Sequence, residues 1–449
     1  MSVQHRVALC ACLFLSVAAF GFLEPFVPLF LELSGLSRGQ IGLVTGIGTG
    51  AALVIQPLLG RLSDRLDARR PLMFGAAVAS GVAYLLYRQA HGLIPFMLLT
   101  AVGINGVMYL NTAAAVLVGR MVSRQGNGSQ QQGGAGAFAS FRVWGSLGYV
   151  VVSLLIGWLL GQRLAAGATM SRAAIAPVFL YGPLIFALVA GVILLLPDPK
   201  RTEPMVETDS GASPAIMDEA QTLSEQRTRA HNLTRFFRAQ FLLVFAYTGS
   251  SAYLSLYLKG LGATPFWITA VFATGVLCEA IVMMQVGRLS DRFGRRPLLA
   301  VAYVFMPIRL LLYIVATGPG WVLAVQTIHG INFGVLAALA AVFVNDLCSE
   351  HNRGATQAKL AAAWGLAAAL GPAFGGVFAQ QLGLRANFAI MAGVAALGAA
   401  QFLWKVRESH PHPVLLYRHG PAHLRSVLGL LSIPANRLPR RAKAQKESK

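Results

Sequence analysis

The sequence predicts an all-α membrane protein with twelve transmembrane helices, arranged as two related six-helix halves. Three observations support this prediction: the composition, the length of the apolar runs, and a motif that occurs twice. Of the 449 residues, 55% are hydrophobic and only 12% are charged, and the mean hydropathy is +0.60. Soluble globular domains contain fewer hydrophobic and about twice as many charged residues, so this composition indicates a membrane protein.

Twelve apolar runs are long enough to cross a bilayer, which takes about 20 helical residues. Because backbone groups in lipid must be hydrogen-bonded within the segment, runs of this length form helices, whereas a barrel would show short alternating segments. The expected spans begin near Val7, Gly39, Pro71, Leu93, Phe138, Ala173, Phe237, Pro265, Pro297, Trp321, Thr356 and Ala386. We expect the first run to be a retained span, not a signal peptide, because it continues to Leu31.

The basic residues predict the orientation. With the N-terminus in the cytoplasm, 29 of the 37 Lys and Arg residues fall on the cytoplasmic side, 6 fall on the other side, and Arg142 and Arg309 lie inside spans. This asymmetry predicts a multi-pass protein of a bacterial-type inner membrane with both termini cytoplasmic. It also explains the net charge of +20 without nucleic acid, and the basic tail can contact anionic lipid.

A polar segment divides the chain. Residues 198–236 are rich in Glu, Ser, Thr and Gln and are expected to form a cytoplasmic linker. The linker joins an N-terminal six-helix half at residues 1–197 to a C-terminal half at residues 237–406, and a basic tail follows at 407–449. We expect a monomer.

The repeated motif is Gly-Arg-Leu-Ser-Asp-Arg. It follows the second span at residues 60–65 and the eighth span at residues 287–292, which is 227 positions later. Each copy leads into Arg-Arg-Pro-Leu, at 69–72 and 295–298, although the first copy carries one extra residue. A repeat at half the chain length and at the same topological place predicts two similar halves around a central cavity.

At these residues the sequence resembles the major facilitator superfamily, whose loop between the second and third helices carries Gly-x-Leu-x-Asp-Arg-x-Gly-Arg-Arg. The resemblance implies a transporter that works by alternating access, with the motif steadying one state of the cycle. We expect the glycines to let helices approach closely and the aspartates to contact a neighbouring helix N-terminus. The motif residues are Gly60, Asp64, Arg65, Gly287, Asp291 and Arg292.

Shorter motifs at residues 141–149, 278–281, 308–310 and 326–334 are similar to the oligosaccharide and phenylpropionate proton symporters, the lactose permease-like branch. This resemblance implies that Arg142 and Tyr149 contact the substrate and that Arg309 and His329 take part in proton coupling. The branch's proton-carrying glutamate is replaced by Asn332, which is expected to contact the substrate instead. A carboxylate expected near the end of the fourth helix is also replaced, by apolar residues 116 and 117. The resemblance therefore does not extend to galactoside specificity.

Four charged residues lie inside the expected spans: Glu24, Arg142, Glu279 and Arg309. Each costs about 2.5 to 3.5 kcal/mol at mid-helix on insertion scales, so each is a candidate functional residue. Two acids and two bases cancel formally, which leaves the charge of the substrate open. Arg142 lies about four residues inside its span, so the alternative to substrate binding is a side chain that reaches the cytoplasmic surface.

Glu279 and Arg309 lie about 21 Å and about 18 Å along their helices, near the middle of the membrane. One interpretation is a structural ion pair, in which either residue alone would be an uncompensated charge. The other is proton coupling, because burial favours the neutral acid while Arg309 favours the carboxylate. Since Asn332 cannot titrate, Glu279 is the leading proton site. His329 shares a helical face with Asn332 and either joins the coupling or only packs.

Glu24 directly precedes Pro25 and lies close to Pro28 in the outer half of the first span. Because proline bends or breaks a helix, three roles are open for this carboxylate. It is a second proton site, a substrate contact, or a cap for a broken helix.

No P-loop, zinc-ligand spacing, Gly-x-Ser-x-Gly or Cys-x-x-Cys motif occurs in the sequence. We therefore expect no metal, no cofactor and no enzymatic activity. The sequence-based interpretation is a proton-coupled secondary transporter of a small organic solute, such as a sugar, a nucleoside or an aromatic acid, with symport favoured. The alternatives are a proton-driven efflux antiporter of sugars or drugs and, more remotely, a helical membrane enzyme or receptor.

Replacing Asp291 with Asn keeps its size and removes its charge, so transport should fall while the protein still inserts into the membrane. The same is expected of Asp64→Asn. The measurement is transport rate per inserted protein in vesicles. Unchanged transport rates in both variants would show that the repeated motif only anchors its loops and has no part in the transport cycle.

Overall fold

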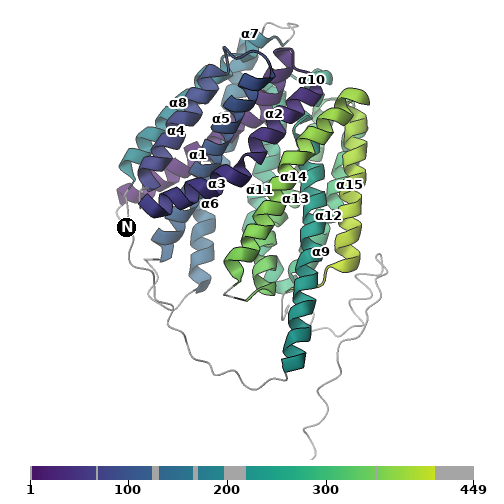
Figure 1. Cartoon of the computed structure of the whole chain (residues 1–449). Coiled ribbons are helices and arrows are strands. Elements are labelled where there is room, and N and C mark those ends of the chain that lie inside the picture. The colour runs from purple at the N-terminus through teal and green to yellow at the C-terminus, as the bar shows by residue number, and fades with distance from the viewer. Residues whose placement is uncertain are drawn as a thin grey trace, which may run out of the picture.

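The computed structural model describes residues 3–66, 69–123, 131–164, 170–196, 219–349 and 352–409. These residues form fifteen α-helices (Figure 1). The helices are α1 (Val3–Leu33), α2 (Arg38–Gly50), α3 (Ala52–Leu66), α4 (Arg69–Leu86), α5 (Leu93–Ser123), α6 (Gln131–Arg163), α7 (Arg172–Ile175), α8 (Val178–Leu195), α9 (Glu219–Ser251), α10 (Leu254–Gly260), α11 (Pro265–Phe293), α12 (Arg295–Ile314), α13 (Pro319–Leu347), α14 (Arg353–Gln381) and α15 (Leu384–Lys405).

Eleven helical spans within the described residues are long and apolar enough to cross a membrane. The remaining expected span, the third, is α4, which packs between α5 and α8. It begins with Arg69 and Arg70, which lower its mean hydropathy. Three expected spans consist of two helices each: α2 with α3, α7 with α8, and α9 with α10. The predicted all-helical membrane fold is confirmed.

Most span starts agree with the sequence prediction within a few residues. The exceptions are α9, which begins at Glu219 within the range assigned to the linker, and α6, which begins at Gln131. Residues 198–218 and most of the basic tail, 410–449, lie outside the described residues. All four cysteines are free thiols.

The first span is one continuous helix, although it contains Pro25 and Pro28. The idea that Glu24 caps a broken helix is therefore wrong. Packing holds the helix together: Phe22, Phe26 and Phe30 are fully buried, and α5, α6 and α8 surround α1. Neighbouring helices commonly make proline tolerable inside membrane helices.

The two halves, α1–α8 and α9–α15, meet closely at one end of the bundle. We call this the distal end, marked by Arg38 and Lys259; it is the upper end in Figure 1, near α7 and α10. Here α2 packs against α14 and α6 against α11. A Cβ on Gly42 would overlap the carbonyl oxygen of Pro372, and one on Gly46 would overlap that of Ala369. The glycines thus allow backbone to touch backbone.

Polar contacts also join the halves at the distal end. Arg38 Nη1 donates to the carbonyl of Ala379 at 3.0 Å, and the backbone N–H of Gly39 donates to Gln380 Oε1 at 2.9 Å. Lys259 Nζ on α10 lies 2.8 Å from Glu32 Oε2 on α1. This end of the bundle is closed.

The opposite end, which we call the motif end, carries Asp64 and Asp291. A Cβ on Gly60 or Gly287 would meet no heavy atom within 4 Å, so the expected close packing at these glycines is absent from this conformation. The side chains of Asp64 and Asp291 are 63% and 72% exposed. The aspartates of both motif copies are therefore exposed in this conformation.

Within the described residues, the motif aspartates contact the first side chain of the next helix and not its backbone N–H groups. Asp64 accepts from Arg69 at 3.0 Å, and Asp291 accepts from Arg295 at 2.8 Å. At the start of α12 the carboxylate of Glu408 accepts hydrogen bonds from the backbone N–H groups of residues 295 and 296. The expected aspartate cap is therefore replaced, in the second half, by a residue that follows α15.

The ion pair between Lys259 and Glu32 should help to keep the distal end closed. Because both side chains are partly exposed, at 31% and 25%, we expect Lys259→Gln to weaken the closed state by up to about 1 kcal/mol. This energy corresponds to about a fivefold shift of the equilibrium towards an open distal end. The measurement is the rate at which an impermeant thiol reagent, added at the distal side, labels Ser251→Cys in a protein without the native cysteines. Lys259→Gln should increase this rate.

Arg88→Gln is the matched control, because Arg88 is exposed at the same end and should leave the labelling rate unchanged. Equal rates in Lys259→Gln and the parent would show that the ion pair does not hold this end closed.

Candidate functional site

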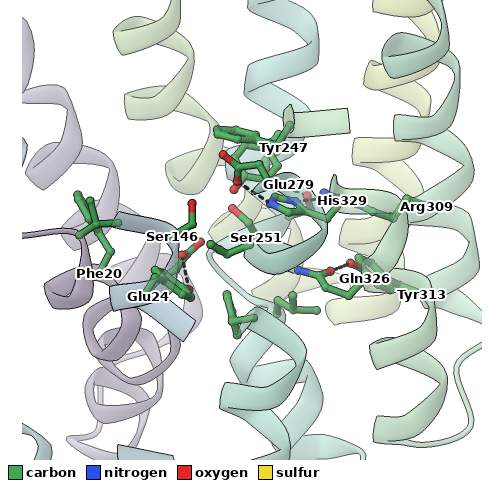
Figure 2. Close-up of a pocket in the computed structure, with 17 residues that line it drawn as sticks. Phe20, Glu24, Ser146, Tyr247, Ser251, Glu279, Arg309, Tyr313, Gln326 and His329 are labelled. Carbon is green, nitrogen blue, oxygen red and sulfur yellow. Dashed lines mark hydrogen bonds and ion pairs between the residues drawn. The ribbon is translucent and has the colours of Figure 1, made fainter. Parts of the chain in front are cut away.

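A cavity of about 160 Å³ lies between the two halves (Figure 2). Its walls come from α1 and α6 in the first half and from α9 to α13 in the second. The lining residues are Val17, Phe20, Glu24, Ser146, Tyr149, Tyr247, Ser250, Ser251, Leu254, Phe272, Val276, Glu279, Arg309, Tyr313, Gln326, His329 and Phe333. The cavity combines aromatic walls with a few polar groups, as ligand sites commonly do.

In the first half, Glu24 and Tyr149 form the polar part of the wall. The Tyr149 hydroxyl donates to Glu24 Oε2 at 2.8 Å. The two side chains meet because α1 and α6 pack closely: a Cβ on Gly21 would overlap the carbonyl of Tyr149, and one on Gly148 that of Phe14. Tyr149, a predicted substrate contact, lines the cavity, but its hydroxyl is hydrogen-bonded to Glu24.

In the second half, three buried side chains form a chain across α11, α13 and α12. His329 Nε2 lies 4.0 Å from Glu279 Oε2, and His329 Nδ1 lies 2.6 Å from Arg309 Nη1. All three are less than 10% exposed. The sequence predicts only that Glu279 and Arg309 lie at similar depth in the membrane, and the structure connects them through the imidazole of His329, as Figure 2 shows.

The contact with Arg309 determines the protonation state and the tautomer of His329. A guanidinium can only donate hydrogen bonds, so Nδ1 of His329 must accept one. A neutral imidazole then carries its proton on Nε2, which is the nitrogen that faces Glu279. The imidazole therefore presents an N–H to the carboxylate and a lone pair to the arginine.

Aromatic rings hold this chain in place. The Arg309 guanidinium lies 5.7 Å from the centre of the Tyr247 ring and 5.9 Å from that of Tyr313. His329 stacks on Phe333, with ring centres 5.4 Å apart. The Tyr313 hydroxyl donates to Gln326. Rings at this distance from a cation contribute a favourable interaction, which is stronger away from water.

Two of the predicted substrate contacts are not placed in the cavity wall. Asn332 is fully buried and donates to the carbonyl of Ala302 at 2.7 Å, so it packs α13 against α12. Arg142 belongs to α6, and its side chain lies outside the described part of the structure. Arg65 and Arg292 are exposed at the motif end.

Sequence reasoning missed the contribution of the seventh span. It stops at Ser251, where α9 ends, and resumes at Leu254 with α10. Tyr247, Ser250 and Ser251, just before the break, line the cavity. The polar Gly-Ser-Ser run at 249–251 within an apolar stretch was the available signal, since broken helices often form transporter binding sites. No group of three His, Cys, Asp or Glu side chains in the described residues is placed to hold a metal ion.

Comparisons with known proteins agree with this architecture. Residues 7–390 match the model of the MFS_1 like family. The chain belongs to this family. The superfamily predicted from the repeated motif is thereby confirmed.

Among curated relatives, the maltose permease of Geobacillus stearothermophilus is 27% identical over 75% of this chain and 78% of its own length. Among solved structures, a mutant of the nucleoside transporter NupG superposes with a TM-score of 0.69 at 15% identity, over 90% of this chain and all of that one. A bacterial homologue of the lysosomal transporter Spinster, described as inward-facing and occupied, gives a TM-score of 0.67 at 14% identity, over 94% of this chain and all of that one.

The MFS_1 like chain is therefore a multi-pass membrane transporter of small solutes, and its named relatives are transporters and not enzymes. The cavity between its halves is where this fold class places the solute.

Proposed function

We propose that this chain is a proton-coupled symporter of a small organic solute, working by alternating access in a bacterial-type cytoplasmic membrane. The observation that supports it best is the buried chain of Glu279, His329 and Arg309 in the wall of the cavity. A titratable carboxylate at the solute site gives a transporter the means to link the proton to the solute.

Coupling follows from the electrostatics of this chain. The ionised Glu279 attracts the Nε2–H of His329 and, beyond it, the charge of Arg309. A proton on Glu279 removes that attraction, so the geometry of the cavity wall depends on the protonation state of one group. Solute bound against the same wall therefore has a different affinity in the two states, which is what thermodynamic coupling requires. Glu24 is a second candidate proton site.

Orientation and partners belong to the same proposal. The motif end faces the cytoplasm, so both termini are cytoplasmic and the closed distal end faces outward. The protein acts as a monomer with protons, solute and lipid as partners. The relatives' names, a maltose permease and a nucleoside transporter, support a small organic solute. Arg142, Tyr149 and Asn332 remain predicted substrate contacts.

The direction of coupling is tested with the solute that a counterflow screen of sugars, nucleosides, amines and aromatic acids identifies. When this solute is added to lightly buffered vesicles, a symporter should draw protons in the same direction as the solute. The measurement is the pH change inside and outside the vesicles. Proton movement opposite to the solute would establish an efflux-type antiporter and reject symport.

Glu279→Gln should uncouple transport, because glutamine resembles the protonated acid. We expect the variant to bind solute and exchange it across the membrane, yet to lose most of its accumulation against a gradient. Exchange and proton-driven uptake are measured on the same purified protein. If Glu279 had only a structural role, its removal would leave Arg309 without an acidic counterpart and reduce folding and exchange together.

Glu24→Gln is the matched control for that experiment, since it changes the other carboxylate of the cavity. It should retain accumulation at saturating solute. Normal pH-driven accumulation by Glu279→Gln would reject its assignment, and loss of accumulation in Glu24→Gln would move the proton site to α1.

A further inference from the structure

The described lining of the cavity carries more negative than positive charge. It contains the carboxylates of Glu24 and Glu279 and one guanidinium, that of Arg309. His329 accepts a hydrogen bond from Arg309 on Nδ1 and is therefore neutral in this arrangement. Because Glu279 and Arg309 are connected through His329, their charges offset each other within the second half. When both acids are ionised, the excess negative charge is therefore left on Glu24.

Glu24 has room for a further partner. Among the described residues its hydrogen bond comes from Tyr149 to Oε2, and none of the described lysines or arginines forms an ion pair with it. A carboxylate has two oxygens and about four acceptor positions, so Glu24, which lines the cavity, can accept further hydrogen bonds. Glu24 is half-buried in the wall of the cavity, and a carboxylate that is partly removed from water without a positive partner is costly. A cationic solute would supply that partner.

Other groups of the lining suit the same ligand. Ser146 and Ser251 also line the cavity (Figure 2), and their hydroxyl oxygens can accept hydrogen bonds from an ammonium group. Phe20 precedes Glu24 by one helical turn on α1. Tyr247 already lies beside one cation, Arg309, which shows that rings of this cavity accept positive charge at their faces.

The size of the cavity limits the solute. Its volume of about 160 Å³ is close to the roughly 150 Å³ of an engineered cavity that holds one benzene molecule. One ring with a short polar substituent is therefore the scale that fits. A carboxylic acid of that size would place its own negative charge near Glu24.

We propose that the solute is a small organic cation with one ring, and that its positive group binds Glu24. The inference rests on the proposed transport function and names a class of solute for the same cavity, one that the names of the reported relatives do not include. It assigns separate tasks to the two halves: Glu24 binds the solute, and Glu279 carries the proton.

The test compares three ligands of matched shape on the purified full-length chain in nanodiscs. They are phenethylamine, which is cationic, phenethyl alcohol, which is neutral, and 3-phenylpropionate, which is anionic. Isothermal titration calorimetry should give an affinity for the amine at least about tenfold higher than for the alcohol, as a hydrogen bond between charged groups provides, and the weakest binding for the acid.

Glu24→Gln keeps the size of the side chain and an acceptor for Tyr149. It should weaken amine binding at least about tenfold and leave the affinity for the alcohol nearly unchanged. Glu24→Asp, which retains the charge, should keep the preference for the amine. Glu279→Gln is the comparison at the other carboxylate. Proton coupling lets this variant change the affinity for the amine and the alcohol together, but the preference for the amine over the alcohol should remain, because Glu24 keeps its charge.

Several results would overturn the inference: no binding of the amine, equal or tighter binding of the alcohol or the acid, or a loss of the preference for the amine in Glu279→Gln instead of Glu24→Gln. Counterflow in proteoliposomes separates this inference from the proposed function. Binding of the amine without counterflow would support the site and reject the transport proposal. Proton-coupled counterflow of a neutral or acidic solute, without amine binding, would reject the site and leave the transport proposal standing.

Discussion

The close approach of α2 to α14 is the contact on which the rest of this conformation depends. Gly42 and Gly46 leave no space between their backbone and the carbonyls of residues 372 and 369. This contact brings the two halves together at the distal end, where the ion pair of Lys259 with Glu32 can form. This contact therefore closes the bundle on the distal side of the central cavity.

The two halves of the bundle differ in how the charged groups of the cavity are paired. The second half holds an acid, a neutral imidazole and a guanidinium in one connected chain, in which the charges of the acid and the guanidinium offset each other. The first half holds Glu24 with a phenol as its described partner. Because uncompensated charge in a low-dielectric interior is costly, the two walls of the cavity have different electrostatic needs, and this asymmetry gives each half a distinct task.

The sequence predicted the fold well because membrane helices need long apolar runs, and these are visible without a structure. It placed the start of α5 at Leu93 and that of α11 at Pro265, where the structure has them. It missed the extension of α9 to Glu219, because that part of the helix is polar and lies beyond the apolar run. The start of α4 was expected correctly, although its two arginines lower its hydropathy.

The candidate site was only partly predictable. Buried charges are rare in membrane helices, so Glu24, Glu279 and Arg309 were found from the sequence alone. The position of His329 between Glu279 and Arg309 was not predicted, because helical spacing gives the face on which a residue lies but not its partner on another helix. Asn332 illustrates this limit: it lies three positions from His329, yet its side chain contacts Ala302. The break after Ser251 depends on tertiary packing and left only a weak signal.

The glycine contact between α2 and α14 has an energetic consequence. Where backbone lies against backbone, few side-chain rotamers must be reordered when one half turns against the other, so the entropy that such a movement costs is small. The balance between the two states then depends on the packing of this contact and on the few polar contacts around it. A ligand shifts that balance only by the difference between its affinities for the two states.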